Sequence, residues 1–232
     1  SFAVYPIVTQ AVGAKHVITQ AIEWGHDLDA MLASVNDSTR LMFIANPNNP
    51  TGTWVDKNNL RNLLEKIPSH VIVLVDEAYF EYAKIEKEYP NCSSWISDFH
   101  NLIVTRTFSK AYGLAALRIG YSLSHSKIAD LLNRVRQPFN NNSLALVAAE
   151  VALQDSEYIE SSIKLNQSGM KQLTQAFDNM GLAYIPSKGN FICVNFEQPA
   201  IEIYENLLKS GVIVRLSLIH ISETTRLGMI SY

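Results

Sequence analysis

The sequence predicts an α/β protein whose first half forms a mainly parallel sheet. Residues 39–44, 71–75 and 101–105 have the composition of strands, and residues 57–66 have the apolar spacing of a helix. The run 71–75 is continuously apolar, as expected for a parallel strand that is buried on both faces. Strand, helix and strand at this spacing favour a parallel sheet that helices cover.

Turns and breaks in the sequence mark where the predicted strands and helices end, in the order of the chain. The first strand is ended by the turn cluster Asn-Pro-Asn-Asn-Pro-Thr-Gly at 46–52. A helical pattern over 127–136 is broken by Gln-Pro-Phe-Asn-Asn-Asn at 137–142. The elements expected after this break are helices over 143–153 and 157–180, a strand over 189–196 and a helix over 201–210. We therefore expect a change of domain near Asn140.

The composition limits the classes of partner. The chain has 232 residues, 47% of them hydrophobic and 18% charged, as in a globular protein with a sizeable core. A net charge of -3 gives no reason to expect nucleic acid or an anionic membrane as a partner. The apolar run at 71–75 is far too short to span a bilayer, and no secretory signal is visible. Two cysteines make no disulfide framework, so we expect reduced thiols in a cytoplasmic protein.

Polar residues follow the predicted strands, at the edge where open parallel sheets bind ligands. These residues are Asn49, Asp76, Tyr79, Thr107, Ser109, Lys110 and Arg118. Each alone has a structural explanation: an Asn-Pro turn is usually only a turn, an aspartate after a strand often caps a helix or binds a metal, and a loop lysine is usually solvated. Together and in this order these residues indicate a binding site. We do not expect this site to hold a metal.

The combination provides what pyridoxal phosphate requires of a protein, since this cofactor acts as an electron sink that must be held and tuned. The amine of Lys110 would form an imine with the cofactor aldehyde. The carboxylate of Asp76 would keep the ring nitrogen protonated, and Asn49 and Tyr79 would hydrogen-bond the ring oxygen. The groups expected to hold the phosphate are Thr107, Ser109 and Arg118.

Three segments resemble the fold-type I aminotransferases, and within them the histidinol-phosphate aminotransferase family. They are Asn-Pro-Asn-Asn-Pro-Thr-Gly at 46–52, Val-Asp-Glu-Ala-Tyr-Phe-Glu-Tyr at 75–82 and the lysine segment at 106–121, which begins Arg-Thr-Phe-Ser-Lys-Ala-Tyr-Gly. Further similar segments are 137–145, 189–192 and 211–215. The resemblance covers residues 1–215. It implies a three-layer pyridoxal-phosphate transferase large domain over 1–140, followed by bridging helices and a partial α+β small domain over 141–215.

The resemblance also implies a function. It implies a homodimeric enzyme of histidine biosynthesis that transfers an amino group between L-histidinol phosphate and 2-oxoglutarate, which becomes glutamate. It places Phe2 where a family aromatic residue stacks on the cofactor ring, and Arg215 where a family arginine contacts the substrate phosphate. From the residues alone, Phe2 is equally well a core aromatic and Arg215 a surface charge.

Other functions stay open. One is a related aromatic or phospho-amino-acid aminotransferase or decarboxylase on the same scaffold. Another is an aminotransferase-like sensor domain of a transcription regulator, although the segment 137–145 favours the enzyme. A third is that the chain by itself is inactive.

The two ends of the chain depart from the family pattern. The chain begins with Ser in an apolar, strand-like stretch, and the family's N-terminal arm and phosphate-binding helix start have no counterpart, so we expect a truncated N-terminus. Residues 216–232 do not resemble the family and are similar to a translated sequencing adapter. We expect them to be a non-native tail outside the fold, and we give Arg226 no role.

Overall fold

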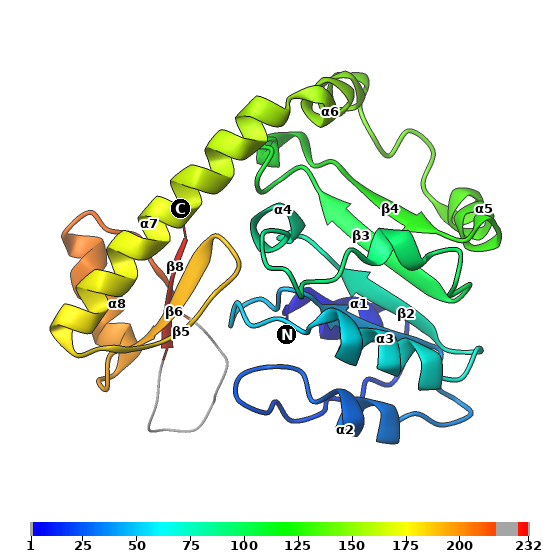
Figure 1. The fold of residues 1–232 in the computed structure, drawn as a ribbon, viewed down its shortest axis with the longest axis horizontal. Coiled ribbons are helices and arrows are strands. Elements are labelled where there is room, and N and C mark those ends of the chain that lie inside the picture. The colour runs from blue at the N-terminus through cyan, green and yellow to red at the C-terminus, as the bar shows by residue number, and fades with distance from the viewer. Residues whose placement is uncertain (1, 217–226, 232) are drawn as a thin grey trace.

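The computed structural model describes residues 2–216 and 227–231 (Figure 1). Its first sheet consists, in spatial order, of β1 (Leu41–Ala45), β2 (Ile72–Asp76), β3 (Leu102–Thr107) and β4 (Gly120–Ser124). The strands β1, β2 and β3 run parallel, whereas β4 runs antiparallel to β3. The predicted α/β architecture with a mainly parallel sheet is confirmed, and the antiparallel edge strand β4 was not predicted.

One face of this sheet is covered by α2 (Leu28–Ala33), α3 (Lys57–Lys66) and the 3-10 helix η1 (Cys92–Trp95). Val73 and Val75 of β2 are buried there against the apolar side of α3. The α3 helix begins where Asp56 accepts hydrogen bonds from two backbone N–H groups of its first turn. Because side chains alternate along a strand, Asp76 points to the opposite face from Val75.

The opposite face carries α1 (Val4–Ala11). The apolar stretch at the start of the chain was expected to be strand-like, and this expectation is wrong. Pro6 is compatible with a helix here because it lies in the first turn, where backbone N–H groups have no partner within the helix. The ring of Tyr5 stacks on that of Phe43 of β1, with ring centroids 4.7 Å apart and an interplanar angle of 11°.

Five further helical segments connect and extend the first sheet. They are α4 (Phe80–Ala83), η2 (Ala115–Leu117), α5 (Ser126–Val135), α6 (Ser143–Gln154) and α7 (Ser156–Met180). The predicted break at 137–142 separates α5 from α6, and Asn142 caps α6. The long helix α7 extends from the first sheet to the second, and Gly181 ends it with a φ of 68°.

The second sheet is antiparallel, with the spatial order β5 (Ala183–Ile185), β6 (Phe191–Asn195), β8 (Leu227–Ser231) and β7 (Arg215–Leu216). Helix α8 (Ala200–Lys209) precedes β7. Ile192 and Val194 of β6 pack against Phe177 of α7. The expected strand and helix of this α+β unit are thus present, each shifted by one or two residues at its ends.

The structure differs from the expectation for residues 216–232. Leu216 lies in β7, and Leu227–Ser231 form β8, which pairs with β6 along its length. Without β8, β6 would be an edge strand with unpaired backbone N–H and C=O groups, and an extended segment can pair with such groups whatever its side chains. The rest of this stretch, including Arg226, lies outside the described residues.

The two sheets meet through a shared apolar cluster to which Tyr79 and Ala111 contribute from one side and Ile163, Phe191 and Cys193 from the other. In residues 2–216 and 227–231, none of the helices combines the length and apolar composition that crossing a bilayer needs.

Candidate cofactor site

The parallel strands of the first sheet bring the predicted residues to one edge. Asp76 is the last residue of β2, Thr107 is the last residue of β3, and Asn49 lies in the turn after β1. The register pairs Ala45 with Asp76 and Asp76 with Thr105, so the three strands end side by side. The structure therefore gathers these segments at the carboxyl ends of parallel strands, as predicted.

Asn49 and Tyr79 form a hydrogen-bonded pair. The Asn49 Nδ2 donates to the Tyr79 hydroxyl over 2.7 Å. Tyr79 is buried, and its ring meets that of Phe191 edge to face at 5.1 Å between centroids. Burial raises the pKa of Tyr79, and the Asn49 hydrogen bond opposes that rise. The hydroxyl therefore stays protonated at neutral pH and can donate to an oxygen placed beside it.

Lys110 lies half-buried in the turn after β3, with its Nζ 5.3 Å from the centroid of the Tyr79 ring. Burial lowers the pKa of the Lys110 amine, and the positive charges of Arg215 and Arg118 lower it further. A lowered pKa increases the fraction of neutral amine, which is the nucleophilic form. The Lys110 amine is therefore neutral at a lower pH than the amine of a solvated lysine.

Hydroxyl and guanidinium groups gather next to Lys110. The Ser109 N–H donates to Thr107 Oγ1 over 3.1 Å, and Arg118 Nη1 donates to Ser109 Oγ over 3.3 Å. Arg118 is exposed, and its backbone has a left-handed φ of 53°, held in part by its contact with the Ala115 carbonyl. Donors of this kind, facing solvent, suit an anion such as a phosphate.

The carboxylate of Asp76 is held at both oxygens. Its Oδ2 accepts from the Tyr5 hydroxyl over 2.7 Å, and its Oδ1 accepts from the Ala78 N–H over 3.1 Å. A carboxylate offers about four acceptor positions, so these two contacts leave capacity for another donor. Sequence reasoning did not assign a role to Tyr5. The only signal in the sequence was that Tyr5 follows Phe2 by three residues. In a helix this spacing of about one turn would place the two aromatic side chains next to each other.

The structure brings the two residues assigned by resemblance close to this site. Phe2 meets Tyr5 edge to face, with centroids 5.8 Å apart, so it adjoins the residue that binds Asp76. Arg215 is exposed on β7, and its charge lowers the pKa of both Lys110 and Tyr79. Whether Phe2 stacks on a cofactor and Arg215 grips a substrate stays a prediction.

A buried ion pair lies on the other side of the same strand ends, and sequence reasoning missed it. Arg106 Nε and Nη2 donate to Glu77 Oε2 over 2.9 and 2.8 Å, and Glu77 Oε1 accepts from the Cys92 N–H. Glu77 is fully buried, and the Arg106 guanidinium lies 3.5 Å from the Phe80 ring centroid. Burial raises the pKa of Glu77, and Arg106 opposes that rise. We regard the carboxylate as ionised because both of its oxygens accept hydrogen bonds.

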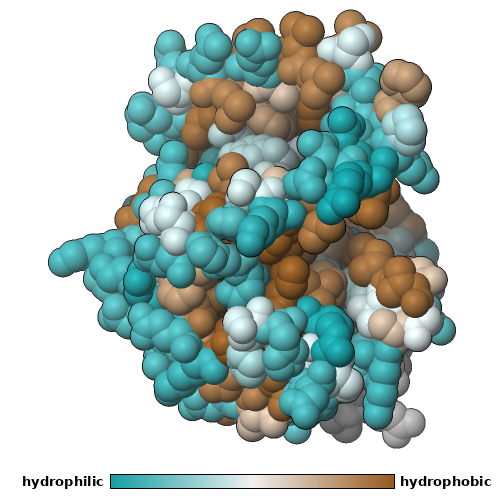
Figure 2. Space-filling model, turned by 90° about the vertical axis from the view of Figure 1, so that its right-hand side faces the viewer, coloured by the Kyte–Doolittle hydropathy of each residue, from teal (hydrophilic) through white to brown (hydrophobic). Residues whose placement is uncertain are grey.

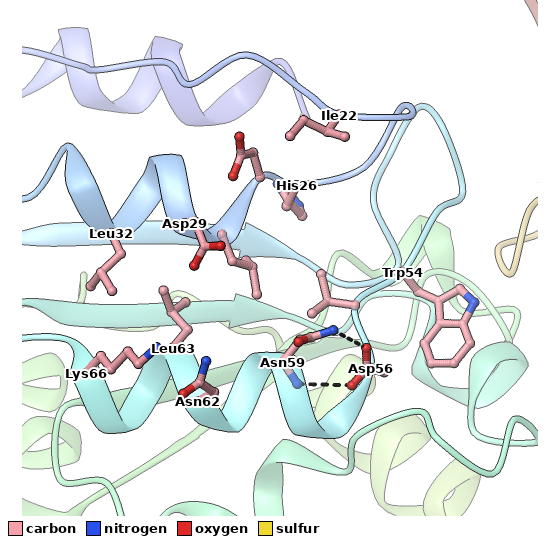
Figure 3. A pocket seen from close by; sticks show the side chains of 13 residues that line it. Ile22, His26, Asp29, Leu32, Trp54, Asp56, Asn59, Asn62, Leu63 and Lys66 are labelled. Carbon is pink, nitrogen blue, oxygen red and sulfur yellow. Dashed lines mark hydrogen bonds between the residues drawn. The ribbon is translucent and has the colours of Figure 1, made fainter.

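A pocket of about 330 Å³ opens elsewhere, between α2 and α3 (Figure 3). Two of its three acidic groups already have structural partners: Asp27 caps α2 and Asp56 caps α3, while Asp29 lies in the first turn of α2. His26 Nε2 donates to the Ala45 carbonyl oxygen over 2.9 Å. Burial lowers the pKa of His26. None of the predicted site residues lines this pocket, so we place the chemistry at the strand ends.

The gathered groups fit the functional groups of pyridoxal phosphate one by one. Lys110 matches the aldehyde, and Asp76, with unused acceptor capacity, matches a protonated ring nitrogen. The Asn49–Tyr79 pair matches the ring oxygen. The phosphate is matched by the group of Thr107, Ser109 and Arg118.

The fold and site thus define a class: an α/β protein with a half-buried lysine, a carboxylate and a turn rich in hydroxyl and guanidinium donors at the ends of parallel strands. The chain belongs to the family of aminotransferases of class I and II, whose model matches residues 1–231. It is 58% identical to histidinol-phosphate aminotransferase 2 of Pseudomonas fluorescens (strain Pf0-1), over 93% of the chain and 58% of that relative. It is 56% identical to histidinol-phosphate aminotransferase 1 of Nitrosococcus oceani, over 92% of the chain and 58% of that relative.

Solved structures agree with this fold. The crystal structure of histidinol-phosphate aminotransferase from Sinorhizobium meliloti, in complex with pyridoxal-5'-phosphate, has a TM-score of 0.89 and 30% sequence identity. That comparison covers 99% of this chain and 63% of the other. An L-threonine-O-3-phosphate decarboxylase from Porphyromonas gingivalis, at 20% identity and a TM-score of 0.83, shares the fold. The chain spans 58% of the length of the first two relatives.

Proposed function

We propose that the complete protein containing this chain is a pyridoxal-phosphate-dependent aminotransferase that acts on L-histidinol phosphate and 2-oxoglutarate. The products would be imidazole-acetol phosphate and glutamate. The observation that carries the proposal is the convergence of Lys110, Asp76 and the Asn49–Tyr79 pair at the ends of three adjacent strands. The 58% identity to a histidinol-phosphate aminotransferase supports the choice of substrate.

Each residue would have a distinct task. When bound, the cofactor supplies an electron sink for the pair released at the substrate's alpha carbon. Lys110 would hold the cofactor covalently and, once the substrate has displaced it, move a proton at its Nζ. Its lowered pKa favours the neutral amine that can accept this proton. Asp76 would keep the proton on the ring nitrogen, and the Tyr79 hydroxyl would donate to the ring oxygen.

Arg215 would distinguish the substrate. Its charge acts on Lys110 and Tyr79, so a phosphate bound to Arg215 would lie within electrostatic reach of the reacting amine. Arginine suits this role because its planar fork binds a phosphate through two parallel hydrogen bonds. This contact would select phosphorylated amino donors.

We also propose that the complete protein is a cytoplasmic homodimer. Apolar side chains are exposed along α5, the break after it and α6: Leu131, Val135, Phe139, Leu144 and Val147. Figure 2 shows hydrophobic surface in its upper part, at the height of α6 in Figure 1. Exposed apolar surface of this kind is typical of a surface that is covered in the complete protein. The cover would be a partner subunit or the segments that correspond to the rest of the relatives' length. Sedimentation of the complete protein would measure its mass.

The test of function is a substrate comparison with the complete, cofactor-loaded protein. L-Histidinol phosphate, L-histidinol and O-phospho-L-threonine are each supplied with 2-oxoglutarate, and glutamate and carbon dioxide are measured. We expect glutamate from L-histidinol phosphate and much less from L-histidinol. Carbon dioxide from O-phospho-L-threonine without glutamate would instead support a decarboxylase. No turnover of any donor by a cofactor-loaded dimer would favour a sensor role.

A further inference from the structure

Tyr5 is the group on α1 that reaches the carboxylate at the end of β2. Its hydroxyl donates to Asp76 Oδ2 over 2.7 Å, although the two residues are 71 positions apart. Its ring lies parallel to Phe43, with centroids 4.7 Å apart. The stack on Phe43 and the hydrogen bond therefore hold the two ends of one side chain.

The contact fixes a carboxylate that would otherwise rotate. Terminal torsions of aspartate side chains are broad, so one hydrogen bond leaves much freedom. Here the Ala78 N–H holds Oδ1 and the Tyr5 hydroxyl holds Oδ2, which together set the plane of the carboxylate. Burial and the neighbouring Asp76 charge raise the pKa of Tyr5, so its hydroxyl stays a donor over the whole working range of pH.

We infer that Tyr5 is a positioning residue for Asp76, one that orients the carboxylate. This inference rests on the proposed function, in which the charge of Asp76 keeps the cofactor ring nitrogen protonated. Tyr5 itself would not touch the reacting atoms. The unused acceptor positions of Asp76 would be directed at the ring nitrogen because the used ones are fixed by α1 and by the backbone after β2.

The competing explanation is that Tyr5 is only a packing residue. Tyr5→Phe separates the two explanations, because it removes the hydroxyl and keeps the ring that stacks on Phe43. The chain offers a matched control. The hydroxyl of Tyr184 lies beside another aspartate, Asp178, in the second sheet's domain and away from the strand ends that carry the site. Tyr184→Phe makes the same chemical change there.

The experiment is a double-mutant cycle on the affinity of the complete protein for pyridoxal phosphate. The variants are Tyr5→Phe, Asp76→Asn, their combination and the Tyr184→Phe control. We expect Tyr5→Phe to weaken binding roughly tenfold, the lower range for a hydrogen bond to a charged group, and to have less than about a twofold effect when Asp76 is already Asn. The control should bind as the wild type does. A Tyr5→Phe effect of equal size in both backgrounds, or none in either, would overturn the inference.

A second readout needs no cofactor. The chain is labelled with carbon-13 at the tyrosine Cζ atoms, and the resonance absent from the Tyr5→Phe spectrum is assigned to Tyr5. Asp76→Ala should shift this resonance, and an unshifted resonance would overturn the contact. If the wild-type protein binds no pyridoxal phosphate, the proposed function fails together with the positioning role. Normal wild-type binding with equal losses in both backgrounds overturns the role of Tyr5 alone.

Discussion

Asp76 and Glu77 are neighbours in the chain, but the end of β2 directs them to opposite sides of the first sheet. Glu77 is fully buried, and both of its oxygens are occupied by Arg106 and the Cys92 N–H. Asp76 is only partly buried and keeps unused acceptor positions. Removing the charged partner of a fully buried carboxylate destabilises the fold, whereas a partly buried carboxylate with unused acceptor positions is available to a ligand. The two sides should therefore respond to mutation in opposite ways.

The largest expected effect is on the Glu77 side. Arg106→Met leaves a buried carboxylate without its charged partner, and we expect the free energy of unfolding to fall by about 3–5 kcal/mol. Denaturant unfolding would measure it. The matched control is Arg61→Met, since Arg61 pairs with Glu65 and Asp98 at the surface. There we expect a loss of about 1 kcal/mol or less. Equal losses in the two variants would show that the buried pair matters no more for stability than a surface pair, which would contradict the structural role given to the Glu77 side.

A mutation of Asp76 should change the rate of turnover rather than the free energy of unfolding. Asp76→Asn keeps the shape of the side chain and removes the charge that holds the proton on the ring nitrogen. We expect turnover of the complete protein to fall roughly 100- to 1,000-fold, the range for loss of one electrostatic contact to a reacting group. The free energy of unfolding should change by less than about 1 kcal/mol. Near-normal turnover at full cofactor occupancy would contradict the role of Asp76.

Arg215 should show a smaller and selective effect. A charge-assisted contact with a phosphate contributes roughly 1.5–3 kcal/mol, so Arg215→Ala should lower kcat/KM for L-histidinol phosphate by about 10- to 150-fold. A phosphate-free amino donor should lose much less. Steady-state kinetics with both donors provides the comparison, and equal losses would show that Arg215 does not read the phosphate.

The smallest expected effect is a change in the pH dependence of Lys110. Burial and two nearby arginines lower the pKa of its amine, so the neutral form appears at a lower pH than in an ordinary lysine. Acylation of Lys110 in the cofactor-free chain, followed by mass spectrometry, should level off at a correspondingly lower pH. Arg215→Ala removes a positive charge and should move this plateau to higher pH. An unmoved plateau would contradict the proximity of Arg215 to the amine.

The sequence could predict the parts of the molecule that depend on local patterns. The apolar run in β2 and the turn after β1 are local signals, and they placed Asp76 and Asn49 at the ends of parallel strands. The helix α1 was mistaken for a strand because it is short and rich in β-branched residues such as Val4, Ile7 and Val8, which strands favour. The strand β8 was not predicted because residues 216–232 are similar to a translated sequencing adapter and were placed outside the fold. Its pairing with β6 uses backbone groups, which leave no mark on the sequence.

The missed site residues have a different cause. Tyr5 meets Asp76, and Arg106 meets Glu77, only after elements distant in the chain have packed together. Their partners could not be read from spacing along the sequence. The resemblance to known aminotransferases supplied Phe2 and Arg215, and the structure adds the contact and the charge effects that put both near the site.

The central claim is that Lys110 holds the cofactor. The complete protein is incubated with pyridoxal phosphate and reduced with borohydride, which makes an amine–aldehyde linkage permanent, and its peptides are then identified by mass spectrometry. The account predicts one major modified residue, Lys110, and no such adduct in Lys110→Ala. An adduct mainly on another lysine, or full binding without any covalent adduct, would contradict it.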